Sequence, residues 1–296
     1  MSPQLQRAGQ PAAAPPPDDK DKNHIYDGVT GPIWQLAVYQ PVHSGWEFTN
    51  VGGAALLDQL IAMLRLGARH RVLECCSGTG AVSRYLNLRS GCPVTGVEIN
   101  ENQVDHARRL ATGNPDLRYV RSDIERWQLD GTYDLVLAID SLSLLADPLA
   151  VMRTAYQASY PNGVFAIADT VAGSSLSEET RRQAWDLDGI RPLPGPTATV
   201  RMLRSAGFDD VELTDRTSMA VECFDRIGTA LMRREDEITA LVSADELQHW
   251  RDSTEFYLAA YRSRQLTYWR GVARHEDHSG TVSAPRRRAR TTYGGK

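Results

Sequence analysis

Short apolar runs alternate with amphipathic stretches along most of the chain, and this alternation predicts strands separated by helices. We expect strands at residues 72–74, 93–99, 117–120, 133–139, 163–169, 211–213 and 266–273. Apolar residues at helical spacing predict helices at 54–66, 81–86, 101–110, from 148 onward, 177–187, 199–205 and within 219–263. The fourth and fifth apolar runs are continuous, as in strands that are buried on both faces. The pattern therefore predicts an α/β fold with a doubly wound parallel sheet.

The same pattern divides the chain into a folded region and two tails. Residues 1–23 hold runs of Pro and Ala with few large apolar residues, so we expect a disordered tail there. Residues 24–277 form the predicted domain, and residues 278–296 a second, basic disordered tail. Within the domain, the segments 24–50, 170–197 and 219–263 stand outside the regular alternation of strand and helix. We expect these segments to form a cap that determines the substrate.

Composition and charge narrow the function classes. With 42% hydrophobic and 24% charged residues, the chain has the composition of an ordinary globular protein. No apolar run is as long as a membrane span and no basic-then-apolar leader opens the chain, which favours a cytoplasmic protein without a membrane partner. Five basic residues and no acid follow His278, so the body is more acidic than the net charge of −4, and nucleic acid is an unfavourable partner.

The cysteines point to no metal chemistry. Cys75, Cys76, Cys92 and Cys223 form no CxxC pair and no spacing typical of a metal site. Cys75 and Cys76 are neighbours at the end of a predicted strand, where consecutive side chains point to opposite faces. We therefore expect reduced thiols and no metal site.

The run from Glu74 to Gly80 joins the first predicted strand to the next helix. Gly78 and Gly80 let the backbone approach a ligand, towards which the first N–H groups of the helix point. A turn of this kind indicates a nucleotide-binding site. A dinucleotide-binding turn, G-x-G-x-x-G, would place glycines at Cys76, Gly78 and Ala81, so a single glycine fits it. The pattern acid-x-G-x-G-x-G fits better, with Cys76 in place of its first glycine.

Acidic residues stand at the ends of successive predicted strands. In an open parallel sheet, ligands bind outside the carboxyl ends of the strands, so these side chains should converge on one crevice. The alternative for any one acid is that it only caps the next helix. The acids are Glu74, Glu98, Asp123, Asp140 and Asp169.

The glycine turn and these acids occur in an order that resembles the class I S-adenosylmethionine (SAM) methyltransferases. The resemblance spans residues 25–275 and points to small-molecule enzymes related to sarcosine, glycopeptide-sugar and isoprenoid C-methyltransferases. It implies a Rossmann-like, seven-stranded sheet with the last strand antiparallel, a helical cap, SAM as cofactor and a small-molecule acceptor. It rests on Tyr26-Asp27, His43-Ser44-Gly45-Trp46, the glycine turn, Gly96-Val97-Glu98-Ile99, Ser122-Asp123, Asp140-Ser141-Leu142, Asp169 and Ala206-Gly207-Phe208.

Within this resemblance, individual residues acquire roles toward the cofactor. Glu98 is placed to accept hydrogen bonds from both ribose hydroxyls, and Asp123 from the adenine amino group. Tyr26 and Trp46 are candidates to close over the cofactor, with simple packing an equal alternative. The expected cofactor-binding residues are Tyr26, Trp46, Glu74, Ser77, Gly78, Gly80, Glu98, Ile99, Asp123, Ile124, Ile139 and Asp140.

Methyl transfer is an in-line displacement, so the enzyme mainly holds the acceptor atom about 3 Å from the methyl carbon in a dry site. Many relatives carry a histidine base four residues after the acid of the fourth strand, but this chain has Leu144 there. We therefore expect a nitrogen or carbon acceptor, from secondary metabolism, before an oxygen acceptor. His43, Asp169 and Tyr26 are the candidate catalytic residues, with a structural role the stronger alternative for His43.

Other function classes stay open at this point. A cyclase that uses SAM only as a scaffold, or an enzyme that combines C-methylation with cyclisation, would share the same fold. A protein or nucleic-acid methyltransferase and a nicotinamide-dependent oxidoreductase are weaker alternatives. Apolar faces on the cap and on the first predicted helix indicate a homo-oligomer.

Overall fold

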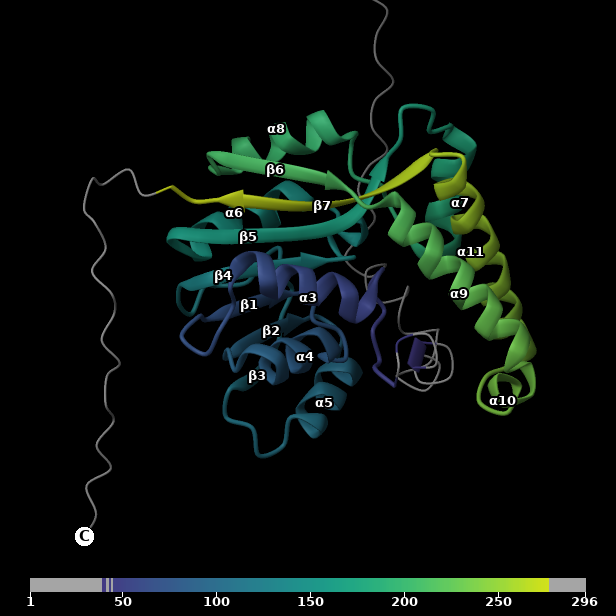
Figure 1. Ribbon diagram of the computed structural model, residues 1–296, viewed down its shortest axis with the longest axis horizontal. Coiled ribbons are helices and arrows are strands. Elements are labelled where there is room, and N and C mark those ends of the chain that lie inside the picture. Colours follow the sequence, from purple (N-terminus) through teal and green to yellow (C-terminus); the bar gives the residue numbers. More distant parts are fainter. Residues whose placement is uncertain (1–38, 41–42, 44, 277–296) are drawn as a thin grey trace, which may run out of the picture.

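The computed structural model of the protein describes residues 39, 40, 43 and 45–276 (Figure 1). The predicted tails at 1–23 and 278–296 lie outside the described residues, as does Tyr26. Of the predicted N-terminal cap segment, 24–50, the structure describes residues 39, 40, 43 and 45–50.

In the described part of the chain, seven strands form one sheet in the order β3-β2-β1-β4-β5-β7-β6. The first five strands along the chain pair in parallel, and β7 runs antiparallel to both β5 and β6. This confirms the expected doubly wound sheet with its last strand antiparallel. The strands are β1 (Val72–Cys75), β2 (Val94–Glu98), β3 (Leu117–Arg121), β4 (Tyr133–Ile139), β5 (Ser159–Ala172), β6 (Asp210–Asp215) and β7 (Leu266–Arg274).

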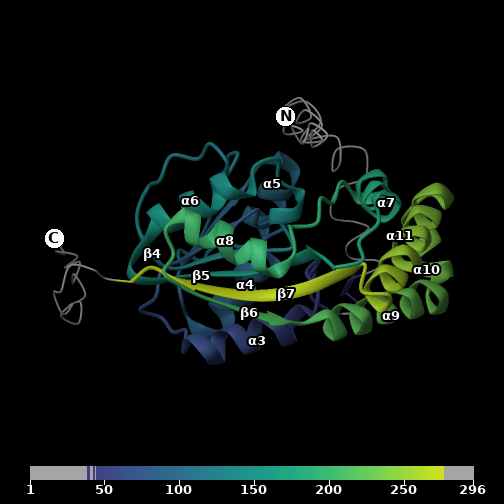
Figure 2. The ribbon, with the colours of Figure 1, turned by 90° about the horizontal axis from the view of Figure 1, so that it is seen from above.

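Helices cover both faces of the sheet. Figures 1 and 2 show α3 and α4 on one face and α6 and α8 on the other. Asn100 and Asp147 accept N–H bonds from the first turns of α5 and α6, which explains why the helices begin there. The helices are α3 (Gly53–Leu64), α4 (Ala81–Ser90), α5 (Glu101–Leu110), the 3-10 turn η1 (Leu142–Leu144), α6 (Pro148–Ala158), α7 (Glu178–Asp188), α8 (Pro196–Ala206), α9 (Thr217–Arg233), α10 (Glu235–Thr239) and α11 (Ala244–Arg262).

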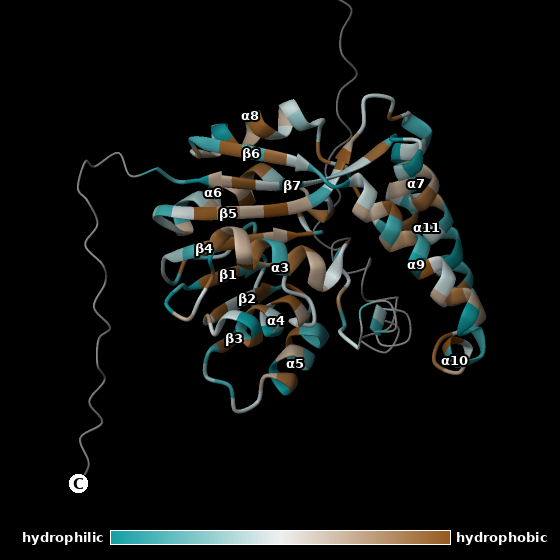
Figure 3. Ribbon diagram, viewed as in Figure 1, coloured by the Kyte–Doolittle hydropathy of each residue, from teal (hydrophilic) through white to brown (hydrophobic). Residues whose placement is uncertain are grey.

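The core lies between the sheet and the two helical layers. Apolar residues concentrate on the strands (Figure 3), and Leu73, Val97, Val136 and Phe165 are completely buried. The interior positions of β4 and the second half of β5 are almost continuously buried, as their unbroken apolar runs predict. β5 nevertheless begins at Ser159, earlier than predicted, because that residue pairs with the start of β4 ahead of an irregularity in the register.

α7, α9, α10 and α11 gather beyond the carboxyl ends of the parallel strands (Figures 1 and 2). α9 packs along α11, and α7 contacts α11. Aromatic contacts of Phe224 with Tyr257 and Tyr261 hold α9 to α11. None of the described helices combines the length and the apolar character that crossing a membrane requires. This helical layer lies where the sequence predicts the cap.

Candidate functional site

The glycine turn follows β1 and adopts an unusual backbone. Gly78 and Gly80 have φ of 53° and 74°, in the left-handed region that glycine tolerates. Cys76 also has a positive φ, 55°, so this residue takes the conformation expected of the glycine that it replaces. A residue other than glycine in this conformation costs about 1–2 kcal/mol of backbone strain. All four cysteines are free.

Glu98, at the end of β2, ties the turn to the neighbouring strand. One carboxylate oxygen accepts the N–H of Gly78 at 3.0 Å, and the other accepts the N–H of Asn100 at 2.9 Å. Burial raises the pKa of Glu98, while these N–H bonds act in the opposite direction. The carboxylate therefore lies between the turn and α5, where it can meet a ligand that approaches either of them.

Glu74 lies behind the turn, 5% exposed, and accepts a hydrogen bond from the Ser83 hydroxyl on α4. Burial raises the pKa of Glu74 to about 8, and the nearby charge of Glu98 adds to the increase, whereas the Ser83 hydrogen bond opposes it. At neutral pH this carboxyl group is largely protonated. A cationic ligand at the turn would favour its ionised form.

This raised pKa predicts a pH-dependent stability. Because the folded state holds a proton that the unfolded state releases near pH 4.5, the free energy of unfolding should fall as the pH rises from about 4.5 to about 8. Glu74→Gln removes this titration and leaves a side chain that still accepts from Ser83. We expect the variant to gain up to a few kcal/mol relative to wild type between pH 5.5 and pH 8.5, measured by urea unfolding. An equal stability difference at both pH values would contradict the assignment.

Two further acids meet beside the end of β4. Asp140 directly follows β4, whereas Asp169 lies within β5, which continues to Ala172, and not at the strand end that the sequence predicts. Asp140, at φ 47°, accepts the Val51 N–H at 2.7 Å and the Tyr268 hydroxyl at 2.9 Å through one carboxylate oxygen. Burial of the carboxyl group and the nearby Asp169 raise the pKa of Asp140 well above its usual range. The Asp140 carboxylate therefore connects β4, β7 and the segment before α3.

Asp169 has different surroundings. Its carboxylate accepts three backbone N–H groups from the turn that follows β4, at 3.1, 2.7 and 3.2 Å. It also accepts the backbone N–H of Thr170 at 2.7 Å. The donors in the turn are Ser141, Leu142 and Ser143. Burial raises the pKa of Asp169 although these bonds oppose the shift. These contacts favour a role in shaping the turn after β4 over the predicted role as a base.

Four buried polar atoms after β1 and β4 and in the segment before α3 have no hydrogen-bond partner among the described residues. Ser77 Oγ follows β1 and Ser141 Oγ follows β4, the adjacent strand. Asn50 Oδ1 and His43 Nε2 belong to the segment before α3. Buried polar groups are nearly always paired, so this arrangement fits a polar ligand that supplies the missing partners.

The other predicted residues lie along the same edge of the sheet. Ile124 is buried and Ile99 and Ile139 are partly buried at the ends of β3, β2 and β4. Asp123 follows β3 and accepts the Glu125 N–H at 3.0 Å. These residues share the carboxyl edge of the sheet with Glu98.

Trp46 and His43 lie in aromatic surroundings. Trp46 stacks on Phe48 with ring centroids 5.3 Å apart and meets Tyr85 edge-on at 5.1 Å, which favours a packing role. His43 stacks on Tyr39, and burial, with the nearby charge of Arg226, lowers the pKa of His43 to about 4. His43 is therefore a neutral imidazole at physiological pH.

The match to known proteins decides the family. Residues 49–213 match the family model described as a methyltransferase domain. The chain belongs to this methyltransferase family. This match and the relatives described below show that the protein is a SAM-dependent methyltransferase. The unpaired serines, the glycine turn and Glu98 fit a ligand that carries an amino acid end and a ribose.

The methyltransferase is similar to several N-methyltransferases. It is 25% identical over 208 residues to a sarcosine/dimethylglycine N-methyltransferase of Halorhodospira halochloris, covering 69% of this chain and 75% of the relative. It is 24% identical over 230 residues to a phosphoethanolamine N-methyltransferase of Triticum aestivum, covering 75% of this chain but only 44% of that relative.

The fold of the methyltransferase matches a solved structure of the same kind. The phosphoethanolamine N-methyltransferase 2 of Haemonchus contortus, in complex with phosphomonomethylethanolamine and S-adenosylhomocysteine, aligns with a TM-score of 0.76 at 18% identity. The alignment covers 86% of this chain and 60% of that one. This likeness supports the Rossmann-like methyltransferase fold.

Sequence reasoning missed several residues that the structure brings to the site. Asn50 and Ser141 contribute unpaired polar atoms, and Tyr268 holds Asp140. Ser141 directly follows a strand-end acid, which is a weak local signal. Tyr268 is 128 residues from Asp140 in sequence, so no local pattern could have linked the two. Among the described residues, no cluster of three or more metal-ligating side chains occurs.

Proposed function

We propose that this enzyme transfers a methyl group from SAM to a nitrogen or carbon atom of a small molecule, with an amine nitrogen the first choice. When bound, SAM supplies an electrophilic methyl group on a positively charged sulfur. The chain's own residues bind the cofactor, orient the acceptor and exclude water. Glu98 would accept from the ribose hydroxyls, and the turn at Ser77, Gly78 and Gly80 would hold the amino acid end.

The observation that carries the choice of acceptor is the state of Asp140. Its Oδ2 is committed to Val51 and Tyr268, whereas its Oδ1 makes no hydrogen bond with the described residues. This oxygen of the buried carboxyl group at the end of β4 suits an N–H donor on the acceptor, and a positive charge on the acceptor would favour the ionised form of Asp140. Sarcosine, dimethylglycine and phosphoethanolamine, the substrates in the names of the relatives, are amines.

The sequence of the turn after Asp140, which holds no histidine, supports the same choice. Leu144, in η1, occupies the position at which many relatives carry histidine. A hydroxyl acceptor needs a base, whereas an amine that binds unprotonated does not. His43, neutral and with an unpaired Nε2, is our first candidate to take a proton after transfer, but the burial that lowers its pKa to about 4 makes it a weak base. Tyr26 and Asp169 are the weaker candidates.

A panel of acceptors tests this proposal. The purified enzyme would be incubated with methyl-labelled SAM and sarcosine, dimethylglycine, phosphoethanolamine, geranyl diphosphate or a catechol, and the products analysed by mass spectrometry. We expect labelled amine or carbon products together with S-adenosylhomocysteine. Labelled catechol as the sole product would overturn the preference against oxygen.

The alternatives give different products. A cyclase that uses SAM only as a scaffold would convert its substrate without producing S-adenosylhomocysteine, and a combined enzyme would produce both a ring and S-adenosylhomocysteine. Label in a protein or nucleic acid alone would replace the small-molecule proposal.

We further propose a cytoplasmic, secondary-metabolic enzyme that acts as a homo-oligomer. Free cysteines support a reducing compartment. The resemblance to glycopeptide-sugar and isoprenoid methyltransferases supports secondary metabolism. Exposed Met232 and Leu241, near the far end of the cap helices, support self-association.

A further inference from the structure

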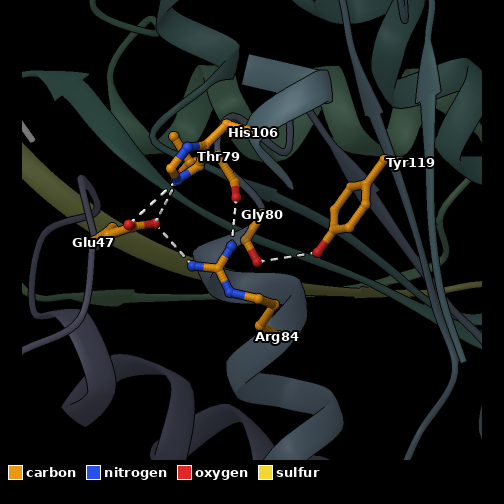
Figure 4. A network of polar contacts seen from close by, with 6 residues as sticks. All are labelled: Glu47, Thr79, Gly80, Arg84, His106 and Tyr119. Atoms are coloured by element: carbon orange, nitrogen blue, oxygen red, sulfur yellow. Dashed lines mark hydrogen bonds and ion pairs between the residues drawn. The ribbon is translucent and has the colours of Figure 1, made fainter. Parts of the chain in front are cut away.

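Glu47 is a buried acid in a segment that has no helix or strand to hold it. Its side chain is 9% exposed, and residues 46–49 form neither element. A carboxylate buried in this way requires compensation by charges or hydrogen bonds. Arg84 Nη2, on α4, lies 2.9 Å from Glu47 Oε2, and His106 Nε2, on α5, lies 3.3 Å from Oε1 (Figure 4). Glu47 thus connects the segment before α3 to the helices α4 and α5.

The same arginine also holds the glycine turn. Arg84 Nη1 donates to the Thr79 carbonyl at 2.7 Å (Figure 4). The next residue, Gly80, donates its N–H to Ser77 and accepts from the Tyr119 hydroxyl at 3.2 Å. The Arg84 guanidinium therefore bridges the cofactor turn and Glu47 with separate nitrogen atoms.

A backbone hydrogen bond holds the same segment in place four residues after Glu47. The Val51 N–H donates to Asp140, at the end of β4, at 2.7 Å. β1 and β4 are neighbours in the sheet, and the strand order reverses between them. Residues 47–51, which we call the strap, therefore cross the switch point where ligands of such sheets bind. Asn50, with its unpaired Oδ1, lies within the strap.

We propose that Glu47 and Arg84 are positioning residues that keep the strap across the bound cofactor and slow its release. This inference rests on the proposed cofactor site at the ends of β1 and β4. A cofactor beneath the strap can leave only when the Glu47 to Arg84 ion pair or the Val51 to Asp140 hydrogen bond breaks. Through Arg84, the Glu47 contact connects the strap to the glycine turn, so its loss makes both the strap and the turn more mobile.

The test measures how fast S-adenosylhomocysteine leaves, which requires no knowledge of the acceptor. Dissociation would be followed by stopped-flow tryptophan fluorescence after mixing the complex with excess SAM. Glu47→Gln keeps the shape and removes the charge, and we expect about a tenfold faster dissociation from the loss of one charge-assisted contact. Arg84→Lys keeps a positive charge that can still pair with Glu47, so we expect a smaller effect; it loses one contact, because a single ammonium cannot reach both Glu47 and Thr79.

The matched control is Arg89→Gln on the same helix. Arg89 pairs with Asp58 at 3.4 Å on the exposed side of α4 and does not contact the turn. We expect its dissociation rate to equal that of wild type. In the double variant of Glu47→Gln with Arg84→Gln, the dissociation rate should rise by less than the product of the increases in the two single variants, because both lose the Glu47 to Arg84 contact.

A merely structural role would give a different result. Both Glu47→Gln and Arg84→Lys would then melt at lower temperature while the folded protein released S-adenosylhomocysteine at the wild-type rate, and this would overturn the proposal. Tight binding by wild type with unchanged rates in the variants rejects the strap alone. Failure of wild type to bind S-adenosylhomocysteine would instead reject the proposed cofactor site, and the strap with it.

Discussion

Glu98→Ala is expected to weaken the binding of SAM and S-adenosylhomocysteine more than about 100-fold. The variant removes the proposed acceptor for two ribose hydroxyls, and each hydrogen bond to a charged group contributes about 1.5–3 kcal/mol. It also removes the hydrogen-bond acceptor of the Gly78 and Asn100 N–H groups, so the glycine turn is no longer hydrogen-bonded to the Glu98 side chain of β2. Isothermal titration calorimetry of wild type and variant gives the ratio directly.

A nearby acid provides the control for Glu98. Glu101→Ala removes an exposed carboxylate on α5 that pairs with Arg121 at 2.9 Å, outside the turn. We expect this variant to bind both adenosyl ligands as wild type does. Binding by Glu98→Ala within threefold of wild type, in a protein with a wild-type melting temperature, would contradict the assignment of the ribose site.

Gly80→Ala is expected to destabilise the protein by about 2–5 kcal/mol and to weaken cofactor binding strongly. An added Cβ would lie 2.4 Å from the Tyr119 hydroxyl oxygen and 2.6 Å from the carbon that carries it. Tyr119 is buried and donates to the Gly80 carbonyl, so it cannot move away freely. The cost combines about 1–2 kcal/mol for a left-handed alanine with about 1–3 kcal/mol for overpacking. Urea unfolding measures the stability and calorimetry the binding.

The other end of the same helix offers a matched control for Gly80. Gly91 has φ 71°, close to the 74° of Gly80, but a Cβ there would lie 3.3 Å from Ala68 Cβ, a much milder contact. Gly91→Ala should therefore lose only about 1 kcal/mol, from backbone strain, and bind cofactor normally. Equal losses in the two variants would show that backbone conformation, and not the contact with Tyr119, sets the cost at Gly80.

The sequence predicts the sheet and its crevice because the signals involved are local. Continuous apolar runs mark β4 and β5, and a small polar or acidic residue marks where β1, β2 and β4 end. Asn100 and Asp147 precede their helices as the capping rule requires. The parallel topology then brings Glu98 and Asp140 to one edge without any further information.

The contacts that close the site are not visible in the sequence, because they join distant segments through side-chain geometry. Glu47 meets Arg84 and His106 across 37 and 59 residues, and no periodicity connects them. For Asp169, the sequence indicates the region of the side chain but not its role. A strand-end acid predicts a place in the crevice, but the conformation of the η1 turn directs several N–H groups onto its carboxylate.

The central claim is that the crevice at the carboxyl ends of β1, β2 and β4 is a SAM site built around Glu98. Calorimetric titration of the wild-type protein with SAM, S-adenosylhomocysteine and NAD, repeated with Glu98→Ala, tests it most directly. The claim predicts micromolar binding of both adenosyl ligands, loss of that binding in the variant, and no binding of NAD. Binding of NAD alone, or undiminished binding of S-adenosylhomocysteine by Glu98→Ala, would contradict it.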